Sequence, residues 1–280
     1  MNQSWRPWLR GWAVAAVLAI AAPQMAVAQT RPEIHALAAR PASAIFIGNS
    51  FFYYNNGIQG QIWGLVRDAS VPGPKPFRAT MVTISGAGLE WHDVASYFRP
   101  NAIGAYSFDA HNNVVFNNIA KLFDVAVMMD CSQCPIHPRL AGVFAEYARK
   151  HAETVRAHGA EPVFFMSWAY ADRPEMTARL AEAYTAAGNA NHALVIPAGL
   201  AFARSVAERP ALDLYAPDKR HPSPAGTYLA AATTFAALFG RSPEGNGYTA
   251  RLDGDTAAFL QRVAWRTVRD YFDGSPRAAN

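Results

Sequence analysis

The feature that most constrains the fold of this chain is the regular alternation of short apolar runs with longer amphipathic segments. The apolar runs have the length of β-strands, and the segments between them have the period of α-helices. Strands separated in this way pair in parallel through right-handed crossovers, with helices on both faces of the sheet. The sequence therefore predicts a three-layer α/β/α fold with a mainly parallel sheet, whose strands lie at 44–47, 78–84, 124–129, 162–167 and 193–197.

The segments between and after these strands predict the helices. The first helix, at 57–69, has apolar side chains at helical spacing, namely Ile58, Ile62, Leu65 and Val66. Another begins after Ser223, a favoured N-cap residue, with Pro224 at the first helical position. The remaining helical patterns lie at 114–122, 140–158, 174–187, 225–239 and 255–272, and a proline-rich loop lies at 72–76.

Composition excludes two classes of protein. Apolar residues make up 51% of the 280 residues and charged residues 16%, which excludes a disordered chain. The net charge is +4, but Arg6 and Arg10 lie near the start and the other basic residues are scattered among acidic ones. Because there is no basic stripe, we expect no nucleic-acid partner. No internal repeat or linker divides the rest, so one domain is expected at 29–280.

Residues 1–28 have the pattern of a secretory signal peptide. Arg6 and Arg10 precede an apolar run at 11–22, and a small-residue cleavage site, Ala-Val-Ala, follows at 26–28. The apolar run is shorter than the ~20 residues that span a bilayer. We therefore expect a bacterial protein that is periplasmic or secreted, with no stable membrane anchor once the leader is removed.

Residues that can make a serine nucleophilic follow the predicted strands. Ser50 follows the first strand, Gly86 the second and the segment 130–133 the third. Ligands of open parallel sheets bind beyond the carboxyl ends of the strands, so these positions share one rim. His221 reaches the same rim before the helix at 225–239, and Asp218 lies on the same loop. A hydroxyl, an imidazole and a carboxylate brought together make a serine nucleophilic at neutral pH.

These segments resemble the SGNH (GDSL-like) hydrolase superfamily, in particular its bacterial branch with a GNSF nucleophile motif. Gly-Asn-Ser-Phe at 48–51 is similar to the nucleophile block, and Gly-Ala-Gly-Leu-Glu-Trp-His at 86–92 is similar to the glycine block. Ser-Trp-Ala-Tyr at 167–170 resembles a further shared segment. The stretch 214–230, which contains Asp-Lys-Arg-His-Pro-Ser, is similar to the block that carries the catalytic acid and histidine.

The resemblance implies a flavodoxin-like fold and a serine esterase that works through an acyl-enzyme intermediate, without a metal or organic cofactor. Ser50 would be the nucleophile, His221 the general base and then the acid, and Asp218 the group that fixes the histidine tautomer. The backbone amides of Ser50 and Gly86 would bind the oxyanion. The implied substrate, and the expected partner, is an acylated carbohydrate or a simple short-chain ester.

The segment after the third strand departs from the superfamily pattern. The superfamily usually places an Asn there to complete the oxyanion hole, whereas this chain has Met-Asp-Cys-Ser-Gln-Cys at 129–134. By position the donor falls near Cys131, whose thiol is a weak donor. We expect Gln133 to supply the third donor, with Ser132 as the alternative.

The two cysteines of the chain, Cys131 and Cys134, have a spacing that occurs in several kinds of site. A structural zinc site needs four ligands; His137 would be the third, and nothing supplies a clear fourth. A thioredoxin-like site would have different flanking elements. In an oxidising compartment, a disulfide is the simplest outcome. Two alternatives to an esterase stay open, a glycan-binding relative without catalysis and a thiol-redox or metal protein that uses this cysteine pair.

Aromatic residues in the shared segments have two interpretations each. Trp91, Trp168 and Tyr170 either line the substrate pocket or pack in the core. His92 is expected to be structural or to lie at the substrate rim, and we assign it no catalytic role.

Overall fold

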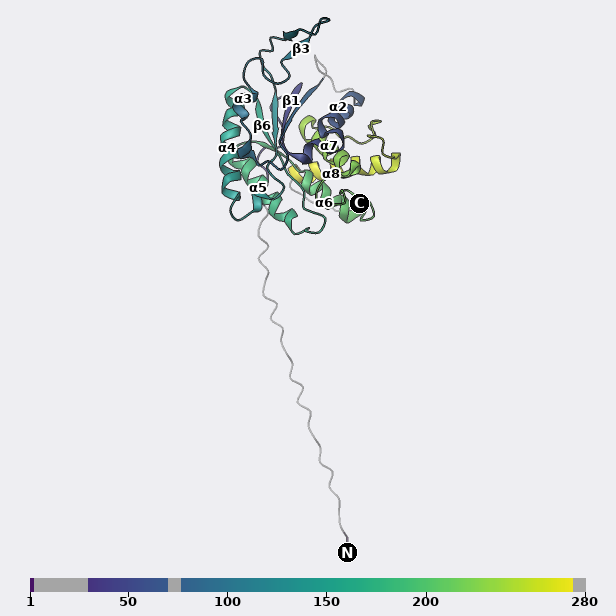
Figure 1. Cartoon of the computed structure of the whole chain (residues 1–280). Helices are drawn as coiled ribbons and strands as arrows, with labels where there is room; N and C mark the ends of the chain where they lie inside the picture. Colours follow the sequence, from purple (N-terminus) through teal and green to yellow (C-terminus); the bar gives the residue numbers. More distant parts are fainter. Residues whose placement is uncertain (3–29, 70–76, 274–280) are drawn as a thin grey trace.

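The central sheet of the protein contains five parallel strands, in the spatial order β2, β1, β5, β6, β7. A computed structural model describes residues 1–2, 30–69 and 77–273 (Figure 1). The predicted leader, apart from its first two residues, and the predicted loop at 72–76 lie outside these ranges. Each strand of the sheet coincides with a predicted one: β1 is Ser43–Gly48, β2 Arg78–Thr83, β5 Val125–Met128, β6 Glu161–Phe165 and β7 Leu194–Ile196.

Helices cover both faces of the sheet, so the predicted three-layer α/β/α fold is confirmed. One face carries α2 (Ile58–Asp68), α7 (Pro224–Phe239) and α8 (Gly254–Asp273), and the other carries α4 (Ala141–Ala157) and α5 (Met176–Ala190) (Figure 1). Within the described ranges, no helix combines the length and the apolar character needed to cross a membrane.

The strand order creates a crevice at the carboxyl ends of β1 and β5. Counted along the chain, the strands of the sheet have the flavodoxin-like order 2-1-3-4-5. β1 is followed by α2 on one face, and its neighbour β5 is followed by α4 on the other face. The loops after these two strands therefore diverge, and ligands of such sheets bind at this switch point.

The core lies on both sides of the sheet and fixes the strands that carry the crevice. β1 and β5 are buried along their whole lengths because helices cover both faces. Phe52, just after β1, packs edge to face against Phe46 and Phe165, with ring centroids 5.7 and 5.0 Å apart. Nearly all of α7 is buried as well. This helix begins as predicted, with the hydroxyl of Ser223 accepting a hydrogen bond from the Gly226 N–H at 3.1 Å.

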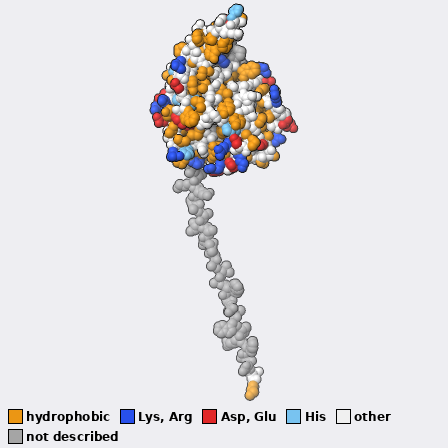
Figure 2. Space-filling model, in the orientation of Figure 1, with side chains coloured by type: hydrophobic (Ala, Val, Ile, Leu, Met, Phe, Trp, Pro, Cys, Tyr) orange, Lys and Arg blue, Asp and Glu red, His pale blue; other side chains and the backbone are white. Residues whose placement is uncertain are grey.

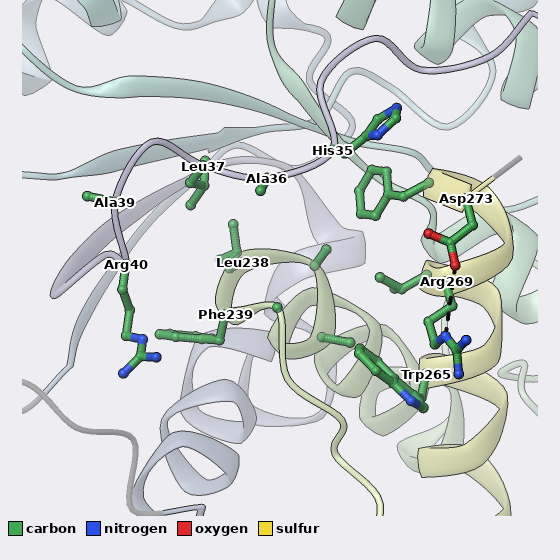
Figure 3. A pocket seen from close by; sticks show the side chains of 15 residues that line it. His35, Ala36, Leu37, Ala39, Arg40, Leu238, Phe239, Trp265, Arg269 and Asp273 are labelled. Atoms are coloured by element: carbon green, nitrogen blue, oxygen red, sulfur yellow. Dashed lines mark ion pairs between the residues drawn. The ribbon is translucent and has the colours of Figure 1, made fainter.

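The segment before β1 packs against the last turns of α7 and α8 (Figure 3). Phe239 ends α7, and Trp265 and Arg269 lie on α8. Together with residues from 35–40 they line a hollow of about 370 Å³. α7 has 16 residues and is therefore about 24 Å long; it begins beside the loop that bears His221, and the hollow lies at its other end.

The predicted helix at 114–122 is wrong. The structure has an antiparallel hairpin there, formed by β3 (Tyr106–Phe108) and β4 (Val114–Phe116), which projects from the molecule (Figure 1). Asp109 closes the turn, since its Oδ1 accepts hydrogen bonds from the N–H groups of His111 and Asn113 at 2.8 and 2.9 Å. The β-branched and aromatic residues of β4 favour a strand once this turn forms. Apolar side chains gather on this projecting end (Figure 2).

One long helix of the structure was not predicted from the sequence. α6 (Ala198–Glu208) begins directly after β7 and packs against α5, α7 and α8. Its alanine-rich sequence has high helix propensity. The pattern was hidden because the apolar residues of β7 run into those of the helix, with Pro197 alone between them.

Candidate active site

Ser50 is the first residue of the short helix α1 (Ser50–Tyr53), immediately beyond β1. The residue before it, Asn49, caps this helix and joins three loops. Its Oδ1 accepts a hydrogen bond from the Phe51 N–H at 3.2 Å. Its Nδ2 donates to the carbonyl oxygens of Ala87, after β2, and Asp130, after β5, at 2.9 and 3.1 Å. Asn49 therefore fixes the serine relative to its neighbouring loops, a role that the sequence analysis did not assign.

The structure brings the three predicted catalytic residues together at the crevice. Ser50 Oγ donates to His221 Nε2 at 2.8 Å, when the ring carries its proton on Nδ1. That Nδ1–H donates to Asp218 Oδ2. The other carboxylate oxygen, Oδ1, accepts from the backbone N–H groups of Arg220 and His221, both at 3.0 Å. The loop between α6 and α7 thus holds the acid and the histidine in one rigid turn.

The electrostatics of the loop keep the acid ionised. Desolvation acts to raise the pKa of Asp218, but hydrogen bonds from the His221 ring and from two backbone N–H groups outweigh it and lower the pKa to about 2. Because the carboxylate stays charged at neutral pH, it holds the proton of the imidazole on Nδ1. The free lone pair of Nε2 then faces the hydroxyl of Ser50.

Aromatic rings fix the plane of the imidazole. The ring of Tyr54 stacks on His221 at 4.1 Å with an interplanar angle of 8°. Phe51 approaches the same imidazole edge-on at 5.5 Å. The neighbouring Asn55 donates to the Pro222 carbonyl at 2.9 Å and to the Thr227 hydroxyl at 2.8 Å. The residues after the nucleophile therefore also anchor the loop that bears the base, which no sequence spacing revealed.

The two predicted backbone donors of the oxyanion hole lie in neighbouring loops. Gly86 is held beside the nucleophile because Ile84 N–H donates to the Gly48 carbonyl at 3.1 Å and Asn49 bonds to Ala87. In the described part of the chain, the N–H groups of Ser50 and Gly86 have no acceptor. Gly86 has φ +73°, a conformation that favours glycine. Both amides are thus available to an anionic oxygen.

The third predicted donor is less tightly held. Gln133 is exposed, and its side chain makes no hydrogen bond to the described residues. The alternative, Ser132, shares a hydrogen bond of 2.7 Å with the hydroxyl of Tyr170. Cys131 offers no thiol, because it forms a disulfide with Cys134 across a Cα–Cα distance of 5.2 Å. Gln133 stays the candidate because its side chain is unengaged.

If Gln133 is the third donor, Gln133→Ala should lower kcat by on the order of 10²-fold with little change in KM, because the donor acts on the developing charge. Ser132→Ala is the matched control, since its hydroxyl is already engaged with Tyr170. Steady-state kinetics with an activated ester distinguish the two. A larger loss for Ser132→Ala would exchange the roles, and no loss in either would leave two backbone donors.

The structure distinguishes the two tryptophans that were expected either to line the substrate pocket or to pack in the core. Trp168 is fully buried and stacks between Phe51 and Phe202, with centroid distances of 4.5 and 4.2 Å. Its Nε1–H donates to the Arg220 carbonyl at 2.9 Å, so this core residue also supports the catalytic loop. Trp91, in contrast, is 59% exposed. It is available to a substrate.

Two buried histidines form hydrogen bonds to backbone carbonyls near the candidate active site. The Nε2 of His92 bonds to the Gly48 carbonyl at 3.0 Å, and the Nε2 of His151 bonds to the Leu89 carbonyl at 2.9 Å. Burial lowers the pKa of both imidazoles below their ordinary value of 6.5, against the opposing effect of these backbone bonds. His92 therefore has a structural role, and both rings are neutral in the folded state at pH 7.

The buried histidines predict a loss of stability in acid. Above pH 6.5 both imidazoles are neutral in the folded and in the unfolded protein. Below pH 6.5 the unfolded chain binds protons first. The free energy of unfolding therefore falls by up to about 1.4 kcal/mol per histidine per pH unit. The double variant His92→Gln, His151→Gln should lose less stability between pH 7.5 and 5.5 than the wild type, as measured by urea unfolding. Parallel pH dependences in the two proteins would contradict this. Carboxylates such as Asp218 titrate in both proteins and cancel.

Comparisons with known proteins support the fold. No protein-family model matches the chain, and no curated protein has a matching sequence. Among solved structures, a protein from Slackia heliotrinireducens with a provisional assignment as an SGNH hydrolase is 23% identical. The match covers 70% of this chain and 98% of the other, with a TM-score of 0.51. A DUF4886 family protein from Bacteroides uniformis is 19% identical, with 81% and 94% covered and a TM-score of 0.56. The expected SGNH hydrolase fold is thereby confirmed.

Proposed function

We propose that this chain, which has the SGNH hydrolase fold, is a serine esterase that cleaves a carboxylic ester through an acyl-enzyme intermediate. The observation that carries the proposal is the continuous hydrogen-bonded series from Ser50 through His221 to Asp218. It lies at the switch point of the sheet, beside two backbone N–H groups that have no acceptor among the described residues. This combination supplies a nucleophile, a base and a site for negative charge.

In the first half-reaction, Ser50 Oγ attacks the carbonyl carbon of the ester while His221 Nε2 takes its proton. The Asp218 carboxylate stabilises the imidazolium that forms. The carbonyl oxygen becomes an oxyanion and accepts hydrogen bonds from the N–H groups of Ser50 and Gly86. Each such donor is typically worth ~2.7–4 kcal/mol of the barrier. Collapse of this intermediate breaks the ester bond, and the proton on Nε2 passes to the leaving alcohol oxygen.

The second half-reaction uses the same groups in reverse. A water molecule gives a proton to His221 Nε2 and attacks the acyl carbon on Ser50. The oxyanion forms again between the same two amides. When it collapses, the bond to Ser50 Oγ breaks and the proton returns from Nε2 to that oxygen. The products are the free acid and the regenerated hydroxyl.

A covalent probe tests the proposed nucleophile directly. A fluorophosphonate should label Ser50 in the purified chain, as mapped by peptide mass spectrometry, and the label should abolish turnover of 4-nitrophenyl acetate. If the folded protein showed no labelling and no turnover, the esterase proposal would be contradicted. A glycan-binding relative without catalysis would then be the better explanation.

We further propose that the protein is exported and that its substrate is an acylated carbohydrate or a simple short-chain ester. The pattern of the leader supports export, and the resemblance of the motifs supports the substrate class. The exposed indole of Trp91, in the segment that follows Gly86, offers a flat apolar surface for the alcohol part of the substrate. A panel of acylated sugars and aryl esters would rank the candidates by kcat/KM.

Removal of the leader after Ala28 is the corresponding prediction for export. Intact mass and N-terminal sequencing of protein from the periplasm or medium should show Gln29 as the first residue. Mature protein that retains the apolar run at 11–22 would contradict both the cleavage and the proposed location.

A further inference from the structure

A buried carboxyl group that ester hydrolysis does not use lies beside the disulfide. Asp130 follows β5, and its side chain is 1% exposed. Its Oδ1 accepts hydrogen bonds from the N–H groups of Leu89 and Cys131 at 3.0 and 2.7 Å. Its Oδ2 is buried and has no hydrogen-bond partner among the described residues. A carboxylate oxygen in this position is costly, so the site favours the protonated acid.

The two cysteines differ in their exposure to solvent and in their contacts. A carboxyl oxygen of Asp130 and the Sγ atoms of Cys131 and Cys134 all lie within 4.8 Å of one another. Cys134 is 6% exposed, whereas Cys131 is partly exposed. The Sγ of Cys131 accepts a hydrogen bond from the Cys134 N–H at 3.1 Å, which would stabilise a thiolate there. Cys131 is thus the more exposed of the two cysteines and Cys134 the buried one, and the sulfur atoms of both lie near the carboxyl group of Asp130.

We propose that Cys131 and Cys134 form a redox-active disulfide that exchanges with small external thiols, and that Asp130 is its proton donor and acceptor. In the described part of the chain, no hydrogen bond joins the Asp130 side chain to Ser50, His221 or Asp218. Gln133, the candidate third oxyanion donor, lies between the two cysteines.

The exchange balances with two external thiols. A thiolate attacks Cys131 Sγ and forms a mixed disulfide, while the bond to Cys134 breaks and its electron pair goes to Cys134 Sγ. That sulfur takes the proton held by Asp130. A second thiolate then attacks the external sulfur of the mixed disulfide, which releases the external disulfide and leaves Cys131 as a thiolate. Two thiols are oxidised as the protein disulfide is reduced; on reoxidation, Asp130 takes the proton of Cys134.

The surroundings of Asp130 suit proton exchange near neutral pH. Burial raises its pKa most, the bonds from Cys131 and Leu89 lower it, the nearby carboxylate of Glu90 raises it, and the result is about 7. From the other elements, the Tyr184 hydroxyl of α5 accepts a bond from the Asp130 N–H at 3.3 Å. His151 of α4 contacts the Leu89 carbonyl. Asn49, which lies between β1 and α1, contributes a neutral side chain that donates to the Asp130 carbonyl.

The test is the rate at which dithiothreitol reduces the full-length oxidised protein between pH 5.5 and 8.5, measured by acid quench and alkylation of free thiols. The rate constant is divided by the concentration of dithiothreitol thiolate at each pH. For the wild type, this normalised rate constant should fall by on the order of tenfold as pH rises through about 7, because Asp130 loses its proton. Asp130→Asn keeps an oxygen acceptor for both N–H groups but holds no acidic proton, so its profile should be flat.

Glu90→Gln is the matched control, since it removes the neighbouring negative charge and keeps Asp130. Its inflection should move to lower pH. A flat wild-type profile, or an inflection that persists in Asp130→Asn, would overturn the proposal. If Asp130→Asn does not fold, the pH profile of Glu90→Gln tests the proposal instead. An inflection at the same pH as in the wild type would mean that a group other than Asp130 titrates, and would overturn the proposal.

Discussion

Replacement of Ser50 by alanine is expected to lower the turnover of an activated ester by at least about 10⁴-fold while the protein stays folded. The hydroxyl is the only group lost, and its one hydrogen bond within the described part of the chain is to His221. Without it no acyl-enzyme can form, and what remains is the modest effect of binding beside the oxyanion donors. Thermal unfolding should change little, since Asn49 and Phe51 keep the helix start in place.

A serine on the same rim provides the control for this prediction. Ser85 accepts a hydrogen bond from Tyr53 at 3.1 Å, and its hydroxyl forms no hydrogen bond with an imidazole of the described residues. Ser85→Ala should therefore retain turnover within a few-fold. If Ser50→Ala hydrolysed 4-nitrophenyl acetate at the wild-type rate, after removal of contaminating esterases, the acyl-enzyme mechanism would have to be abandoned.

Asp218→Asn is expected to cause the second-largest loss, on the order of 10⁴-fold in kcat near neutral pH. The amide can donate to Nδ1 of His221, which would place the ring proton on Nε2, where it cannot accept from Ser50. The backbone N–H groups of Arg220 and His221 still find an oxygen acceptor, so the loop should keep its shape. The loss therefore reports the tautomer of the base rather than the fold.

The pH dependence adds a second measurement of the same role. Because the pKa of Asp218 is lowered to about 2, its own protonation should not limit the wild-type enzyme above about pH 3.

Asp213→Asn is the matched control for Asp218→Asn: this carboxylate lies on the same loop and accepts a hydrogen bond from the Tyr215 N–H at 2.9 Å. Equal losses in the two variants would assign Asp218 a structural role instead.

The sequence predicted the five strands of the sheet and the triad because both depend on local patterns. Each apolar run has the length of a strand, and each motif follows a strand end or precedes a helix start. The hairpin at Tyr106–Phe108 and Val114–Phe116 was not predicted, because its strands are short and exposed, and its turn depends on one aspartate. α6 was not predicted because it follows β7 without a break in the apolar pattern.

The sequence alone is enough to predict the parallel α/β/α fold and the identity of the groups at its carboxyl edge. Periodicity dictates the elements, and the rule that successive strand ends meet at one rim places Ser50, Gly86 and His221 together. The tertiary structure alone decided how these groups are held. Asn49 bonds to loops after two other strands, Tyr54 stacks on the imidazole, and Asp130 lies buried against the disulfide. Each of these contacts joins residues from separate loops or leaves a polar atom without a partner, and such relations arise only when the chain is packed.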